Sequence, residues 1–187
     1  EDTSGPFFPI YFQDESLEDL TVLGPGIVGA PRGQHIILCG RVLDRHGNLA
    51  NGVLMEFWQA NARGIYNSPA NSGHPDLDPW FNGYGRLRSA SGEYKFCTIM
   101  PGASDNRAPN ITITLFSDGI SRIVTQVFFE GHRGNETDPV LKSLDTDDQA
   151  RLIARHGGQT DDGAEIYLLD IVMAGANETP FFDDFES

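Results

Sequence analysis

Residues 110–116 read Asn-Ile-Thr-Ile-Thr-Leu-Phe, a run in which polar and apolar side chains alternate. Successive side chains of a β-strand point to opposite faces, so the two isoleucines and the leucine share a face that we expect to be buried. Asn110, Thr112 and Thr114 share the opposite face, which we expect to remain available. This period of two favours a sheet protein over a helical one.

Five more segments are apolar, rich in β-branched or aromatic residues, and bounded by Gly, Pro, Asn or Asp, which is typical of strands. They are residues 35–44, 52–59, 92–99, 122–130 and 165–173. Only a short turn around Gly47 separates the first two. This spacing favours antiparallel pairing between them.

A single segment, residues 146–156, has a helical pattern. Thr146 and Gln149 have the spacing of a capping box, and Gly157-Gly158 can end the helix. Many short strands followed by one late helix indicate an all-β fold. We predict an antiparallel β-sandwich with long loops and one short helix in the C-terminal half.

The chain is strongly acidic, with 187 residues and a formal net charge of −14 at pH 7. Its length predicts a single domain over residues 1–187. The negative charge would repel phosphate backbones and anionic lipid headgroups, which excludes nucleic acid and membrane surfaces as partners. A small anionic substrate would be repelled as well, unless basic groups stand close to it or a partner subunit supplies them.

Two cysteines, Cys39 and Cys97, lie inside apolar runs. This is typical of buried free thiols, while a disulfide between them stays open. No run of about 18 apolar residues is present, and the start Glu1–Gly5 has neither the basic nor the apolar part of a signal peptide. We therefore expect the protein in the cytoplasm.

The region from Ala60 to Tyr84 is too long for an ordinary connection, and its Asn, Gly, Pro and Asp content indicates a functional loop or an interface. Within it, His74, Asp76 and Asp78 are close enough in sequence to suggest a metal site. Turn and capping roles explain such residues beside proline more often, and we favour them.

Several segments together resemble a known enzyme family. They are residues 38–66, 78–86, 99–102, 126–131 and 138–141. These segments are similar to the signature regions of the intradiol ring-cleavage dioxygenases and extend over most of the chain. The start, Thr3–Pro6, and the tail, residues 178–185, are similar to the iron-free alpha subunit of the two-subunit members in particular.

The resemblance implies a ferric ion held by two tyrosines and two histidines, a donor set that suits Fe(III). In this chain Asn110 and Thr112 occupy the two histidine positions. One tyrosine position falls within Gly102–Asp105 and the other near Gly73, so both tyrosines are absent. The resemblance therefore implies a vestigial pseudo-site, with no metal ligand and no catalytic residue in this chain.

Arg107 stands where the family has an arginine that stabilises the substrate. The pseudo-site is accordingly assigned to Arg107, Asn110 and Thr112. Glu56 is a candidate partner for the guanidinium of Arg107, because a buried carboxylate needs a partner.

The resemblance also implies a partner subunit. In alpha–beta members the active site opens at the subunit interface, where the beta subunit binds Fe(III) and an aromatic acid reacts with O2. The alpha start lines the substrate approach, which in this chain is Thr3, Gly5 and Pro6, and the pairs form a higher-order oligomer. The chain would then be part of an enzyme but inactive alone.

One departure leaves the exact catechol open, because Asp118 replaces an arginine that follows the Leu-Phe strand end in alpha subunits. Two other interpretations remain. One is a non-catalytic β-sandwich scaffold or binding protein of the same descent. The other is an enzyme that holds a different metal at the His74 loop.

Overall fold

The computed structural model of the protein describes residues 17–24, 26–118 and 120–182. The strands within these residues are β1 (Leu17–Asp19), β2 (His35–Leu43), β3 (Leu54–Gln59), β4 (Tyr84–Arg88), β5 (Glu93–Ile99), β6 (Asn110–Ser117), β7 (Ile120–Phe129), β8 (Ile153–Gln159), β9 (Glu165–Leu168) and β10 (Ile171–Val172). The short helical segments are η2 (Pro69–Asn71), η3 (Arg133–Glu136), α1 (Pro139–Lys142) and α2 (Thr146–Leu152).

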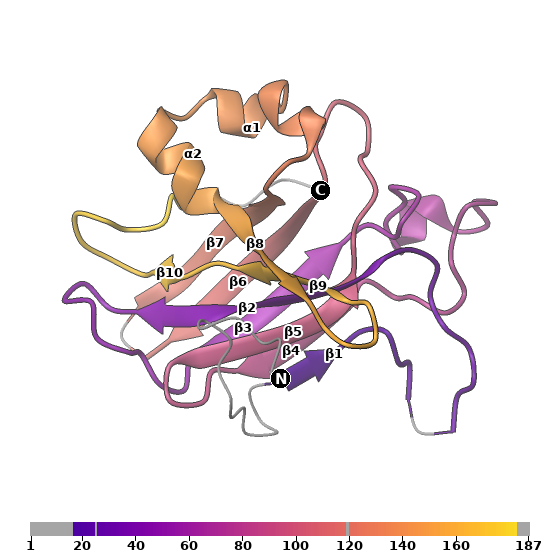
Figure 1. The fold of residues 1–187 in the computed structure, drawn as a ribbon, viewed down its shortest axis with the longest axis horizontal. Helices are drawn as coiled ribbons and strands as arrows, with labels where there is room; N and C mark the ends of the chain where they lie inside the picture. The colour runs from indigo at the N-terminus through magenta and orange to yellow at the C-terminus, as the bar shows by residue number, and fades with distance from the viewer. Residues whose placement is uncertain (1–16, 25, 119, 183–187) are drawn as a thin grey trace.

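The strands form two layers joined by β8. Their order is β1-β5-β2-β9-β8-β7-β6-β3-β4, with β10 beside β2. Phe57 of β3 stacks on Phe96 of β5 with the ring centroids 4.0 Å apart, so the two layers meet face to face. Helices α1 and α2 lie at one end of this arrangement, beside β7 and β8 (Figure 1). The predicted all-β, sandwich-like fold is confirmed.

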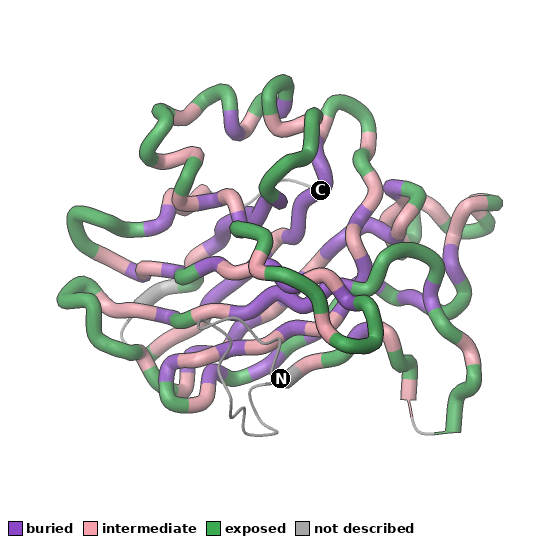
Figure 2. The backbone as a smooth tube through the Cα atoms, in the orientation of Figure 1, coloured by how far each residue is buried: buried purple, intermediate pink, exposed green. Residues whose placement is uncertain are grey.

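The alternation in β6 produces the predicted buried face. Its two isoleucines and its leucine are fully buried in the core between the layers, where the strands of Figure 2 are purple. The opposite face is more covered than predicted. Thr112 is half-buried there, but Asn110 and Thr114 are buried.

The pairing differs from the prediction in two ways. First, four pairs are parallel, namely β1–β5, β2–β9, β2–β10 and β7–β8, so the sheet is mixed rather than purely antiparallel. Second, β2 and β3 do not pair with each other. β2 pairs with β5 and β9, whereas β3 pairs with β4 and β6. The turn at Gly47 therefore carries the chain from one layer to the other instead of closing a hairpin.

The predicted helix is shorter than expected, and a second short helix, α1, precedes it. Helix α2 ends at Leu152, because the following residues pair as β8 with the end of β7. Its N-cap is Asp145, whose Oδ1 accepts a hydrogen bond from the backbone N–H of Asp148 at 2.8 Å, so the cap lies one residue before Thr146. Gly157-Gly158 lies inside β8. Among the described residues, no helix has the length and apolar character needed to cross a bilayer.

Both cysteines are free thiols, as predicted, and the disulfide that the sequence left open is absent. Cys39 lies in β2 and Cys97 in the adjacent strand β5. Burial raises the pKa of Cys39 to about 12 and that of Cys97 to about 11.

Removing the Phe57 ring tests the contact between the layers. We expect Phe57→Ala to lower the free energy of unfolding by about 3–5 kcal/mol, because it deletes a fully buried ring and leaves a cavity. Urea unfolding measures this change. Leu49→Ala, at a side chain that is 51% exposed, is the control and should stay within about 0.5 kcal/mol of wild type. Equal losses in the two variants would contradict the assigned core.

Thiol labelling tests the raised cysteine pKa values. The thiolate is the reactive species, and at pH 8 both thiols are protonated in the folded protein. We expect a thiol reagent to label neither cysteine in the time that it labels both in urea. As the pH rises, Cys97 should react before Cys39, with the fold monitored by circular dichroism. Rapid labelling of native Cys39 at pH 8 would contradict this account.

Candidate functional site

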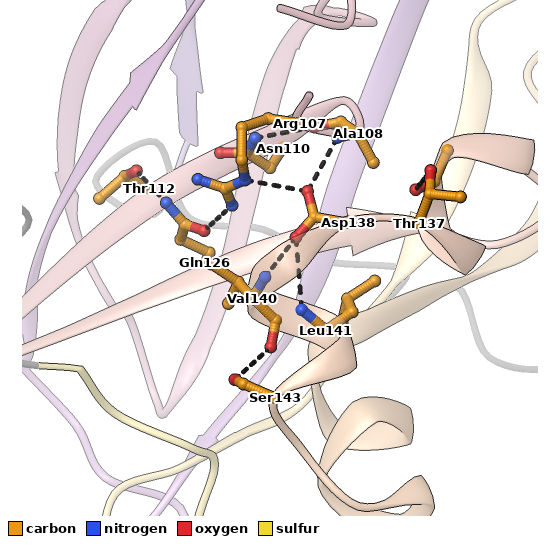
Figure 3. Close-up of polar contacts among 11 residues, drawn as sticks. Arg107, Ala108, Asn110, Thr112, Gln126, Thr137, Asp138, Val140, Leu141 and Ser143 are labelled. Atoms are coloured by element: carbon orange, nitrogen blue, oxygen red, sulfur yellow. Dashed lines mark hydrogen bonds and ion pairs between the residues drawn. The ribbon is translucent and has the colours of Figure 1, made fainter. Parts of the chain in front are cut away.

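The pseudo-site lies on the outer face of the layer formed by β3, β6 and β7. Thr112 of β6 is directly opposite Trp58 of β3 on one side and Gln126 of β7 on the other, so the three side chains share this face. Arg107 reaches the same place from the loop that precedes β6 (Figure 3). The structure thus brings together the three predicted pseudo-site residues, Arg107, Asn110 and Thr112.

A buried carboxylate, that of Asp138, anchors this region. Asp138 is fully buried, and four N–H groups donate to it. Its Oδ2 accepts from Nε of Arg107 at 2.9 Å and from the backbone of Ala108 at 2.8 Å. Its Oδ1 accepts from the backbones of Val140 at 2.9 Å and Leu141 at 3.3 Å, at the start of α1. Sequence reasoning missed this role, although Asp followed by Pro is a helix-start signal.

The guanidinium of Arg107 is occupied by groups of its own chain. Besides the ion pair with Asp138, its Nη2 donates to Oε1 of Gln126, and the group lies 5.9 Å from the centre of the Phe128 ring. Its side chain is 23% exposed. The Nε and Nη2 groups of Arg107 therefore have their hydrogen-bond partners within the chain.

The predicted pairing of Arg107 with Glu56 is wrong. Glu56 of β3 stands opposite Arg86 of β4, and burial together with a hydrogen bond to Glu56 raises the pKa of Tyr84. The carboxylate that pairs with Arg107 is that of Asp138, because the chain folds α1 back against the loop before β6.

Asn110 is buried with an incomplete set of hydrogen bonds. Its Nδ2 donates to the carbonyl of Ala108 at 2.8 Å, and its Oδ1 has no partner. The hydroxyl of Thr112 accepts a long hydrogen bond of 3.4 Å from Nε2 of Gln126. Amide and hydroxyl groups therefore fill the positions at which the resemblance implies histidines.

Two aromatic side chains border the pseudo-site. The rings of Trp58 and Tyr66 lie 5.5 Å apart between centroids. Burial raises the pKa of the Tyr66 hydroxyl, and the nearby charge of Arg107 opposes this shift. Tyr66 is thus a neutral packing group at ordinary pH, as expected for an amphipathic aromatic residue.

The long loop between Ala60 and Tyr84 is tied down by Asn61 and Asp78. The Oδ1 atom of Asn61 accepts hydrogen bonds from the backbones of Arg63 and Ile65, and its Nδ2 donates to the carbonyl of Asp76 at 2.8 Å. Both residues are buried. The loop is therefore a pre-formed part of the surface.

The His74 loop has the turn roles that we favoured. Nδ1 of His74 accepts from the backbone of Asp76, the carboxylate of Asp76 pairs with Arg63 at 2.6 Å, and Asp78 accepts from the backbones of Arg32 and Trp80. Across the described residues, no three His, Cys, Asp or Glu side chains are grouped closely enough to hold a metal ion.

Four predicted residues remain, of which the structure describes only Asp118. Thr3, Gly5 and Pro6 are outside the described residues. Asp118 is exposed in the turn between β6 and β7, at the opposite end of β6 from Asn110. At about 3.3 Å per residue, the length of β6 puts roughly 25 Å between this carboxylate and the pseudo-site.

Fold and site together define a two-layer β protein whose outer-face site is built from amide, hydroxyl and guanidinium groups. A family model described as Dioxygenase matches residues 7–175. The chain is 38% identical over 163 residues to the beta chain of protocatechuate 3,4-dioxygenase from Burkholderia cepacia, with 81% of this chain and 69% of that one covered. It is 33% identical over 160 residues to the alpha chain of the Pseudomonas putida enzyme, with 81% and 77% covered.

The fold is also similar to that of an intradiol ring-cleavage dioxygenase from Tetranychus urticae, with a TM-score of 0.66 at 18% identity over 93% of this chain and 94% of that one. The chain belongs to the intradiol dioxygenase family.

Members of this family depend on iron, but the pseudo-site does not fit a ferric ion. Asn110 and Thr112 offer neutral oxygens where Fe(III) favours imidazole, tyrosinate or carboxylate. The guanidinium of Arg107 adds a positive charge nearby. The carboxylate of Asp138 already accepts four hydrogen bonds.

Neutralising Asp138 tests its anchoring role. We expect Asp138→Asn to lower the free energy of unfolding by about 2–3 kcal/mol, because it breaks a buried pair and leaves the Arg107 charge uncompensated. Urea unfolding measures the loss. Asp118→Asn, at an exposed turn, should change stability by less than about 0.5 kcal/mol. A double-mutant cycle with Arg107→Met should show coupling, and strictly additive losses would contradict the ion pair.

Proposed function

We propose that this chain is the iron-free alpha-type subunit of a protocatechuate 3,4-dioxygenase. Its beta-type partner would bind Fe(III), and the complex would use O2 to open protocatechuate between its hydroxyls, giving 3-carboxy-cis,cis-muconate. The isolated chain would be inactive. The observation that supports the proposal is that Arg107, Asn110 and Thr112 lie together in a form that does not suit ferric iron. The resemblance puts these three residues at positions of the family's catalytic centre.

Sequence identity alone does not choose between the two kinds of subunit. The chain is 38% identical to a beta chain and 33% identical to an alpha chain. The residues at the site support the alpha-type assignment, since a chain without the two histidines and the two tyrosines would not hold iron in the family's manner. Relatives named alpha and beta chains also support a hetero-oligomer as the working form.

The substrate contacts of this chain belong to the same proposal. Thr3, Gly5 and Pro6 would line the approach to the partner's iron, where a Gly-Pro backbone and a hydroxyl suit a planar acid. Arg107 is engaged by Asp138 and Gln126, so the partner would supply the positive charge for the substrate carboxylate. A single domain and a cytoplasmic location stay predictions.

Co-expression with an iron-binding beta-type chain tests the proposal. The two chains should co-purify and convert protocatechuate, while this chain alone should show no ring cleavage. Replacing the partner's iron-binding histidines should abolish turnover. Failure of the two chains to associate, with self-assembly of this chain instead, would favour the non-catalytic scaffold.

The substitution Asn110→Ala tests whether Asn110 takes part in catalysis. Asn110→Ala removes the hydrogen bond from Nδ2 to the carbonyl of Ala108 together with an Oδ1 atom that has no partner, so we expect the free energy of unfolding to fall by about 1 kcal/mol. In the complex, kcat/KM for protocatechuate should stay within about twofold of wild type. A large fall in kcat with unchanged assembly would contradict the assignment of Asn110 to a vestigial site.

A further inference from the structure

The outer face of the layer formed by β5, β2 and β9 carries both cysteines of the chain. In the β2–β5 ladder, Cys39 stands directly opposite Lys95, and Cys97 lies two residues farther along β5. Side chains two residues apart on a strand share a face, so the two thiols are diagonal neighbours on one side of the sheet. The pseudo-site belongs to the other layer, which contains β3, β6 and β7.

The two thiols lie in a small apolar cluster that is separate from the main core. Its other members are Ile37, Ala164, Ile166 and Leu168. Cys39 is fully buried, and its thiol donates a weak hydrogen bond to the carbonyl of Tyr167, with a distance of 3.8 Å from Sγ. Cys97 is only half-buried. Cys97 is therefore the thiol that a small ion reaches first.

The diagonal spacing suits an ion between the sulfurs better than a disulfide. The Cβ atoms of diagonal neighbours lie somewhat less than about 7–8 Å apart, whereas a disulfide requires Cβ atoms about 3.5–4.5 Å apart. Two metal–sulfur bonds of about 2.3 Å each hold two sulfurs up to about 4.6 Å apart. With the Cβ–Sγ bonds added, such a bridge reaches the diagonal spacing, and both cysteines are indeed free thiols.

The number and type of donors decide which ion fits. Zinc takes four ligands in structural sites, but nowhere in the described part of the chain do three His, Cys, Asp or Glu side chains come together. Soft thiolate ligands select Cu(I), a d10 ion that is stable with two thiolates in a linear arrangement. The pair of thiols therefore matches a two-coordinate soft cation.

The charges around the thiols suit such a complex. One Cu(I) ion with two thiolates carries a net charge of −1. Burial raises the pKa of both cysteines, and the charge of Lys95 opposes this rise at each of them, so the same charge offsets that of the complex. Asp19 of β1 is paired with Cys97 in the β1–β5 ladder, and its carboxylate attracts a cation to the half-buried thiol.

We propose that Cys39 and Cys97 form a two-coordinate site for Cu(I), which bridges β2 and β5 on the outer face of their layer. The ion displaces one proton from each thiol and forms one bond to each sulfur, without a change in oxidation state. This inference is independent of the proposed function, because both cysteines lie in the layer that does not carry the pseudo-site.

Competition with a chromophoric Cu(I) chelator, in the absence of oxygen, tests the site in the full chain. The wild type should bind one Cu(I) per chain. Cys97→Ser and Cys39→Ala should each weaken binding by more than the roughly 10–100-fold that loss of an outer-shell partner costs a metal site. His46→Gln, at an exposed histidine, is the control and should bind as wild type. Circular dichroism checks each fold, and Cys97→Ser decides if Cys39→Ala does not fold.

The pH dependence of the affinity counts the thiols that bind. Because two protons are released, the apparent affinity should rise by about 100-fold per pH unit below the thiol pKa values, after correction for the chelator, whereas a single thiol gives about tenfold. A tenfold rise would overturn the site. So would unchanged affinity in folded Cys97→Ser, which would show an adventitious ion only, or one ion shared between two chains.

Discussion

The carboxylate of Asp138 lies in the protein interior, where an unpaired charge would cost several kcal/mol. Four N–H groups converge on it, two from the loop before β6 and two from the start of α1. One carboxylate thereby satisfies the first backbone groups of a helix and fixes a loop that is 30 residues away in sequence. The position of Arg107, and with it the character of the pseudo-site, follows from this contact.

This arrangement explains how the family fold can form with different side chains on the outer face of β6. The two-layer core, with Phe57 stacked on Phe96, does not depend on the outer face of β6. Asn110 and Thr112 can therefore replace stronger metal ligands without disturbing the buried side of the same strand. Arg107 stays because Asp138 and Gln126 hold it, which gives it a structural reason to persist.

The sequence predicts those features that depend on residues close to one another along the chain. Alternation in β6 predicted its buried face, and Arg107, Asn110 and Thr112, which were expected at one site, do lie close together. The sequence pattern does not predict which distant segments pair with each other. Nothing in residues 153–159 indicates that they prefer β7 to the end of a helix, and nothing near Arg107 indicates that its partner is Asp138 rather than Glu56. These choices are made by the tertiary fold, which brings α1 and β8 against the end of β7.

The most direct test of the central claim is the iron content of this chain purified alone, measured with its visible absorbance and compared with the complex. Tyrosinate bound to Fe(III) gives a red-brown colour. The account predicts a colourless chain with far less than one iron per molecule, and a coloured complex with about one iron for each alpha–beta pair. Stoichiometric iron and a charge-transfer band in the chain alone would contradict it, and would mean that Asn110 and Thr112 do not occupy the ligand positions.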